Sequence, residues 1–191
     1  TDSSICRNRL YFRGLIMLQN LFIKCKECGG VIENKKFVEN NYICYLCGYY
    51  GTLDYKKRLA LIIDQGTFEE TNVHTEFINP INFPGYLEKH QSIINKLDLE
   101  EAIITGRGCI DKHKVMIGIM DTRYMMGSMG IIVGEKVTRL FEDANQQGLP
   151  VILFVASGGA RMHSRGRVWA EPTKRNISDT LFYYAKNKNG V

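Results

Sequence analysis

Two pairs of cysteines near the N-terminus constrain the fold more than any other feature of this sequence. Cys25 and Cys28 form one Cys-x-x-Cys pair, Cys44 and Cys47 form a second, and fifteen residues separate the pairs. Two residues between paired thiols allow a tight turn that directs both sulfurs at one ion. Four thiolates complete a tetrahedron and leave no position for water, so the spacing predicts a structural zinc ion bound by these four cysteines.

A thioredoxin-like redox pair is the alternative interpretation of a Cys-x-x-Cys sequence. It is disfavoured because there are two pairs and neither opens a helix in a βαβ unit. A zinc ribbon of this size has almost no core, so metal binding is expected to supply most of its folding free energy, on the order of 10 kcal/mol. We predict that residues 31–43, between the pairs, form short antiparallel strands that bring the two pairs together.

The length of 191 residues allows one ordinary domain together with a small metal-binding module. We predict a leader over residues 1–23, whose order the sequence does not define, a zinc ribbon over 24–51 and an α/β domain over 52–191. Hydrophobic residues make up 45% of the chain, and no apolar run reaches the roughly 18 residues needed to cross a bilayer. We therefore expect a globular protein without a membrane segment.

Helical and strand patterns alternate after the ribbon. Helices are predicted over residues 53–64, before Gly66, and over 85–97, after two prolines. Residues 101–110 and 114–120 read as two strands around a tight turn.

The second of these strands begins a β-turn-α-β unit that extends to residue 161. A glycine turn at 127–130 precedes a helix whose apolar residues recur at helical spacing from Val133 to Ala144. The apolar run 151–155 is typical of a parallel strand buried on both faces, and it ends in a second glycine turn at 157–161. Parallel strands place both turns on one edge of the sheet, where α/β proteins carry their sites.

A glycine turn alone is a weak signal, because glycine also serves ordinary tight turns. Two such turns behind a four-cysteine ribbon make the sequence recognisable. It resembles the β subunits of bacterial-type acetyl-CoA carboxylase carboxyltransferase over about residues 21 to 162, and most closely those of low-GC Gram-positive bacteria. The motifs that agree in order with the family, after the ribbon, are TGRG (105–108), IMD (119–121), MGSMG (126–130), VGEKVTR (133–139) and ASGGARM (156–162).

This resemblance implies an α/β fold of the crotonase type, built from repeated ββα units and here incomplete. It implies an enzyme subunit that moves a carboxyl group from carboxybiotin, on a biotin carboxyl carrier protein, to acetyl-CoA, giving malonyl-CoA for fatty acid synthesis. The implied partners are a carboxyltransferase α subunit, in an α2β2 heterotetramer, and biotin carboxylase. The implied location is the bacterial cytoplasm, with a plastid as the alternative.

Carboxyl transfer needs no nucleophile–base triad, and the four histidines, at positions 74, 90, 113 and 163, are scattered without evident partners. The charges that need stabilising are the enolate oxygen of the thioester and the ureido oxygen of biotin, and backbone amides in a dry cleft can do this. By resemblance, the backbone of Gly158 and Gly159 forms the oxyanion hole. The residues implied to line the acyl-CoA side are Gly127, Ser128, Met129, Gly130, Ala160 and Arg161.

The sequence departs from the family after Met162. The family continues with Gln-Glu-Gly, whereas this chain has HSRGRVWAEP over residues 163–172, and Pro172 with the nearby charges disfavours a buried helix. A second helix is predicted over 177–186. We expect residues 163–191 to be loosely ordered, and the chain to be inactive unless a partner supplies the missing layer.

Two other functions compete with the enzyme subunit. A nucleic-acid-binding regulatory module is conceivable because lysines surround the ribbon together with aromatic residues, which can stack on bases. These aromatic residues are Phe37, Tyr42, Tyr45, Tyr49 and Tyr50. The chain could also be a non-catalytic scaffold for the α subunit. Residues 156–162 favour the enzyme over the binding module, which has no use for that motif.

Overall fold

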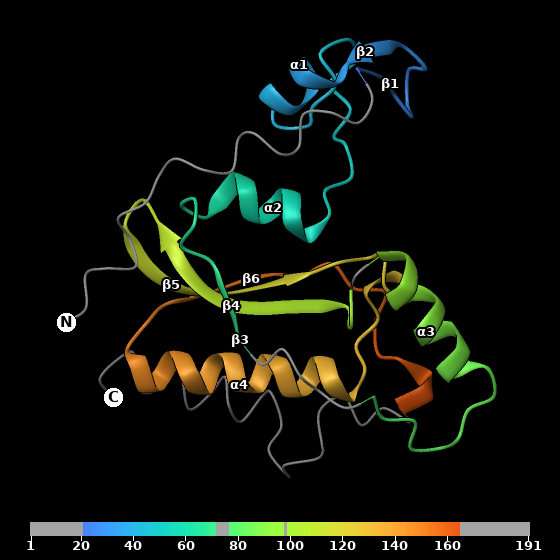
Figure 1. Cartoon of the computed structure of the whole chain (residues 1–191), viewed down its shortest axis with the longest axis vertical. Coiled ribbons are helices and arrows are strands. Elements are labelled where there is room, and N and C mark those ends of the chain that lie inside the picture. Colours follow the sequence, from blue (N-terminus) through green and yellow to red (C-terminus); the bar gives the residue numbers. More distant parts are fainter. Residues whose placement is uncertain (1–20, 72–76, 98, 165–191) are drawn as a thin grey trace.

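The computed structural model describes residues 21–71, 77–97 and 99–164. Most of the predicted leader, the predicted helix at 177–186 and the divergent segment from residue 165 lie outside these ranges. Within them, no helix is long and apolar enough to cross a membrane. Figure 1 shows a central sheet between two helices, α2 Tyr55–Ile62 and α4 Ile131–Gln147, with the cysteine module (residues 22–51) beyond α2.

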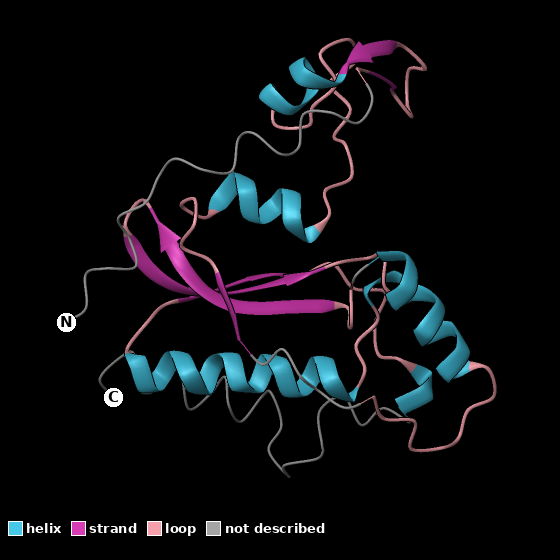
Figure 2. Cartoon of the chain, in the orientation of Figure 1, coloured by secondary structure: helices cyan, strands magenta, loops and turns pink. Residues whose placement is uncertain are grey.

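The sheet contains four strands in the order β3-β4-β5-β6 (Figure 2). They are β3 Glu69–Thr71, β4 Ile103–Ile110, β5 His113–Met120 and β6 Val151–Phe154. β4 and β5 form the predicted hairpin, and β5 pairs in parallel with β6 as the β-turn-α-β pattern predicted. The short strand β3 was not predicted, because its three polar residues carry no apolar pattern.

The β4–β5 turn has only two residues, Asp111 and Lys112, between the paired Ile110 and His113. Both turn residues have positive φ, 46° and 68°, as in the two-residue turns whose twist matches that of paired strands. The carboxylate of Asp64 accepts the backbone N–H of both turn residues, at 3.1 and 2.7 Å. The turn is therefore held by a residue that follows α2.

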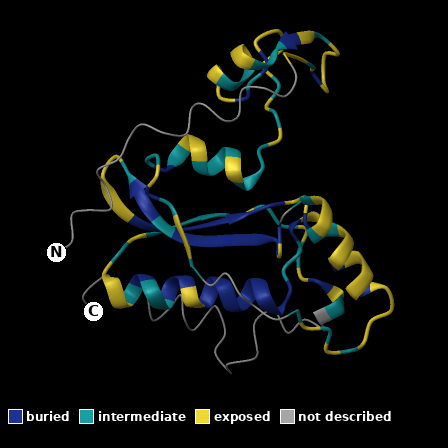
Figure 3. Ribbon diagram, viewed as in Figure 1, coloured by how far each residue is buried: buried dark blue, intermediate teal, exposed yellow. Residues whose placement is uncertain are grey.

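Alternating residues of β5 face two different helices. Val115, Ile117 and Ile119 pack with Ile63 on the side of α2, whereas Met116 packs with residues of α4 on the other side. Gly118 also belongs to the α4 side, where a Cβ would lie only 2.6 Å from the Leu153 side chain. A Cβ at this position would also lie 3.0 Å from the Leu140 side chain of α4, so glycine lets the side chains of β6 and α4 pack closely over β5. Figure 3 shows the buried residues concentrated in β4, β5 and α4.

One prediction about β6 was wrong. The continuous apolar run predicted a strand buried on both faces, but all four residues are only half-buried, and Val155 just beyond is 66% exposed. The reason is topological, since β6 is the last strand of the described sheet and has β5 as its one neighbour there.

The predicted helices that flank the sheet are confirmed with slightly different ends. α2 begins after Asp54, whose side chain accepts the N–H of Lys57 at 2.8 Å as an N-cap. The second predicted helix is α3 Tyr86–Leu97. α4 ends at Gln147, and the next residue, Gly148, caps the helix in the left-handed conformation with φ 65°.

The cysteine module differs from its prediction. β1 Phe22–Lys24 pairs with β2 Val31–Glu33, but the next residues form the helix α1 Asn34–Glu39 instead of a strand. The helix brings Phe37 against the small core around Cys25 and Cys44. The second cysteine pair is spanned by a single bridge between Ile43 and Tyr50.

Asp121, at the end of β5, ties α2 to the sheet. Its buried carboxylate accepts the backbone N–H of Tyr55 at 3.0 Å and binds the Arg123 side chain at 2.7 Å. Burial raises the pKa of this carboxyl, but the bonds from Arg123 and Tyr55 outweigh burial and lower the pKa overall. We expect Asp121→Asn to reduce the free energy of unfolding by about 1–3 kcal/mol at pH 7, measured by urea denaturation.

The lowered pKa of Asp121 also determines how its contribution to stability depends on pH. Because the folded pKa lies below the unfolded value of about 3.9, the stabilisation is present above that value and is lost as pH falls through the folded pKa. The difference between wild type and Asp121→Asn should therefore shrink in acid. Asp143→Asn, on α4, is the control, and equal urea midpoints for wild type and Asp121→Asn at pH 7 would contradict the assignment.

Candidate functional site

The two predicted glycine turns lie side by side at the C-terminal ends of β5 and β6. The N–H of Met129 donates to the carbonyl of Gly159 at 2.9 Å, and the N–H of Arg161 donates to the carbonyl of Met129 at 2.8 Å. These bonds form a parallel bridge between Met129 and Ala160. The structure therefore brings together residues 127–130 and 158–161, which the sequence placed on one sheet edge.

The first turn has an unusual backbone. Three consecutive residues of the 3₁₀ turn η1 Met125–Gly127 have positive φ, at 44°, 57° and 68°. Non-glycine residues with positive φ are strained and occur where the surrounding structure enforces them. Gly127 also has no room for a side chain, because a Cβ there would collide with the carbonyl oxygen of Ala156.

The amides of Gly158 and Gly159 already have acceptors within the chain. Gly158 N–H donates to the carbonyl of Met126 at 3.1 Å, which joins the two turns, and Gly159 N–H donates to Ser157 Oγ at 3.1 Å. A serine hydroxyl can rotate away, whereas the Met126 carbonyl is fixed in the strained turn. Gly159 therefore has the amide that can be released to a ligand with less rearrangement.

The side chain of Arg161, in the second turn, contacts Ser128 in the first turn. The Arg161 guanidinium is buried, forms an ion pair with Glu101 at 2.7 Å and donates to the carbonyl and hydroxyl oxygens of Ser128. Its neighbour Met162, by contrast, is exposed, as is Met126 on the other turn.

Aromatic and histidine side chains pack beside this pair, and the sequence did not reveal them. His90 Nδ1 lies 2.6 Å from the Tyr124 hydroxyl, and His163, in η2 Met162–Ser164, stacks on Tyr86 with ring centres 4.5 Å apart. Within the described part of the chain, His90 and His163 thus have close partners, contrary to the prediction that the histidines are scattered without partners. Burial lowers the pKa of both imidazoles, which favours their neutral form. Each histidine lies more than twenty residues from its partner in the sequence, so sequence spacing could not predict these contacts.

The four cysteines converge as predicted. Their sulfurs all lie within 4.8 Å of one another, and Cys25 Sγ is 3.8 Å from Cys47 Sγ. Metal–sulfur bonds of 2.3 Å in a tetrahedron place sulfurs about 3.8 Å apart. The cluster is therefore compatible with a single metal ion.

The two cysteine turns have the same backbone bonds. Cys25 N–H donates to the carbonyl five residues later and Cys25 carbonyl accepts the N–H of Gly29, and Cys44 makes the equivalent bonds with Tyr49 and Gly48. Both glycines have positive φ, 69° and 75°. This repeated geometry orients each pair of sulfurs in the same way and explains the glycine after each pair.

The crowded thiols favour a bound cation. Backbone N–H groups, chiefly that of Cys28, lower the pKa of Cys25 to about 7. The Tyr49 N–H also lowers the pKa of Cys47, but burial and the neighbouring thiols raise it to about 12. Four thiolates so close together repel one another. A divalent cation bound between them would offset this repulsion and lower the pKa of each thiol.

The aromatic residues proposed to stack on bases are only partly available. Tyr42 is buried, and Phe37 meets it edge-on with ring centres 5.6 Å apart, so both belong to the core of the module. Tyr45 accepts the N–H of Glu33 through its hydroxyl at 3.0 Å, and Tyr50 is exposed. Nucleic-acid binding at this surface stays a prediction.

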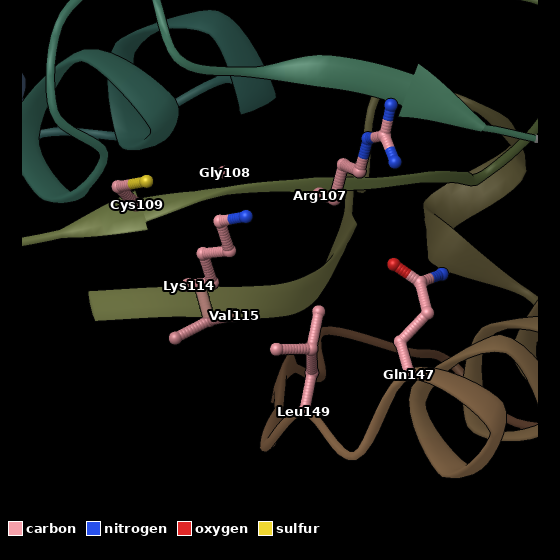
Figure 4. Close-up of a pocket in the computed structure, with 7 residues that line it drawn as sticks. All are labelled: Arg107, Gly108, Cys109, Lys114, Val115, Gln147 and Leu149. Carbon is pink, nitrogen blue, oxygen red and sulfur yellow. The ribbon is translucent and has the colours of Figure 1, made fainter. Parts of the chain in front are cut away.

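A small cavity lies at the opposite end of the sheet, between the β4–β5 hairpin and the C-terminus of α4 (Figure 4). Its volume is about 40 Å³, and it is lined by residues such as Gly108, Val115 and Leu149. Pockets for cofactor-sized ligands are about 300 Å³ or larger. This cavity therefore fits water and is no candidate for an acyl-CoA site.

Comparison with known proteins identifies the family of this chain. Residues 53–169 match the carboxyl transferase domain family. The chain is 41% identical over 144 residues to the acetyl-coenzyme A carboxylase carboxyl transferase subunit beta of Desulforamulus reducens, and 43% identical over 142 residues to that of Clostridium kluyveri. These matches cover 75% and 74% of this chain. They cover 50% and 49% of the relatives, so the chain spans about half of their length.

A solved structure supports the fold. The transcarboxylase 12S structure, with hydrolysed methylmalonyl-coenzyme A bound, superposes with a TM-score of 0.54 at 22% identity. The match covers 82% of this chain and 26% of that one. The predicted crotonase-like α/β fold is therefore confirmed, and this chain contains part of that fold.

Proposed function

Because this chain belongs to the carboxyl transferase family, among the β subunits of acetyl-coenzyme A carboxylase carboxyl transferase, we propose that it forms the thioester-binding part of that enzyme. In this role it would help to transfer a carboxyl group from carboxybiotin to acetyl-CoA. The observation that carries the proposal is the pair of glycine turns, joined by three backbone bonds at the ends of two parallel strands.

The amides of these turns provide the chemistry. Removing a proton from the acetyl methyl group places negative charge on the thioester oxygen, and fixed N–H donors stabilise that charge. We assign this role to Gly158 and Gly159, with Gly159 as the donor that is more easily released from its present acceptor. The backbone of the six residues named from the resemblance would line the acyl-CoA side: Gly127, Ser128, Met129, Gly130, Ala160 and Arg161.

The remaining components follow from the family. The proposed partners are the carboxyltransferase α subunit in an α2β2 assembly, biotin carboxylase, and the biotin carboxyl carrier protein that presents the biotin. We further assign the metal at the four cysteines to one structural Zn²⁺, since four thiolates suit zinc and leave no open position for catalysis. The proposed location is the bacterial cytoplasm, with a plastid as the alternative.

The test is reconstitution. The subunit that contains this sequence is co-expressed with an affinity-tagged α subunit, and formation of malonyl-CoA from acetyl-CoA is measured with carboxylated biotin carrier protein. We expect co-purification in equal amounts and turnover that requires both subunits. Co-purification without turnover would favour the non-catalytic scaffold. Failure to bind α, together with retention of RNA or DNA, would favour the nucleic-acid module.

A further inference from the structure

Arg161 uses every hydrogen-bond donor of its guanidinium on protein atoms. Nε donates to Ser128 Oγ at 3.2 Å. Nη1 donates to the Tyr86 hydroxyl at 2.9 Å and to Glu101 Oε2 at 3.1 Å. Nη2 donates to Glu101 Oε1 at 2.7 Å and to the Ser128 carbonyl at 2.6 Å. A guanidinium has five N–H groups, so none remains for a substrate.

The turn that Arg161 contacts is the strained one. Ser128 directly follows the three residues with positive φ, and Arg161 binds both its carbonyl and its hydroxyl oxygen. A strained backbone persists only where its surroundings hold it in place. The Arg161 side chain adds two charge-assisted bonds to the backbone bonds that join the turns, and such bonds are the stronger kind.

Glu101 orients the guanidinium from the sheet. Its side chain is 1% exposed, it lies two residues before β4, and it also accepts the backbone N–H of Ala102 at 2.7 Å. Apolar residues can replace a buried ion pair at little cost in stability, so stability alone does not account for this pair. Its two-pronged geometry does fix the direction of a planar guanidinium.

We propose that Arg161 is a positioning residue that, oriented by Glu101, locks the strained turn 125–128 against the turn 157–161. It thereby holds the amides of both turns as one rigid set. This assignment rests on the proposed function for its effect on catalysis, although the lock itself is independent of it. It replaces direct binding of substrate by the Arg161 side chain.

The test uses Arg161→Lys in the complex of the full-length subunit with its α subunit. Lysine keeps the charge, but its single ammonium group cannot reach Glu101, Tyr86 and Ser128 together. We expect amide exchange in residues 125–130 to accelerate about tenfold or more, while α4 is unchanged. For malonyl-CoA formation, kcat should fall about 100-fold and the KM for acetyl-CoA should stay within about twofold.

Two further variants keep the test decisive. Arg161→Met with Glu101→Gln removes both charges, so that neither is left buried alone if Arg161→Lys does not fold, and it should show the same changes. Arg107→Lys alters an exposed ion pair with Glu69 in the same sheet and should change neither readout. The proposal is overturned if exchange in the turn is unaffected, or if KM rises with kcat retained, as loss of a substrate contact predicts. If Arg161→Lys accelerates exchange in the turn but the wild-type complex itself shows no turnover, the result counts against the proposed function alone.

Discussion

Removing the metal is expected to unfold the cysteine module over residues 22–51 and to leave the sheet intact. The module has a core of only a few side chains around Cys25, Ile32 and Cys44, whereas the sheet has its own larger core. Structural zinc contributes about 10 kcal/mol or more to the folding of such small modules. Elemental analysis should find one zinc per chain, and chelation should abolish amide protection in the module.

Cys44→Ser should reproduce the effect of chelation, because Cys44 is the buried cysteine of the second pair. Lys26→Ala, which alters an exposed residue between two ligands, is the matched control and should retain both zinc and protection. A purified, reduced protein without metal, whose module melts at the same temperature before and after Cys44→Ser, would rule out the zinc site.

Gly127→Ala is expected to lower kcat for carboxyl transfer by about 100-fold or more. A Cβ at this position would collide with the carbonyl oxygen of Ala156, so the two glycine turns must separate. Their separation would break the bond from Gly158 N–H to the Met126 carbonyl and displace the proposed oxyanion donors. Malonyl-CoA formation by the complex with the α subunit is the measurement.

Gly148→Ala provides the control for backbone strain. Gly148 has nearly the same φ, 65° against 68° for Gly127, but a Cβ at Gly148 meets nothing within 4 Å. Both variants therefore pay a similar cost for a left-handed residue, about 1–2 kcal/mol, and only one displaces the site. Equal activity of the two variants would remove the turn at residue 127 from the proposed site.

Local patterns predicted much of the fold because they report contacts between neighbours in the sequence. The β4–β5 hairpin, helix α4 and the parallel strand β6 follow from apolar spacing and turn residues. The same reasoning missed β3, whose residues are polar and which is defined only by pairing with β4. It also overestimated the burial of β6, because an apolar run does not reveal how many neighbours a strand has.

What the sequence determined by itself was the set of groups to which we assign the chemistry: four thiols at a spacing that brings them into one cluster compatible with a metal ion, and two glycine turns on one sheet edge. Each cysteine pair and each glycine turn is defined by residues close together in the sequence, and the local backbone geometry fixes their relative positions. Only the tertiary structure decided how the turns are held. Glu101, Tyr86 and Arg161 come from segments up to 75 residues apart, and their bonds exist only once α3, the start of β4 and the second turn have packed together.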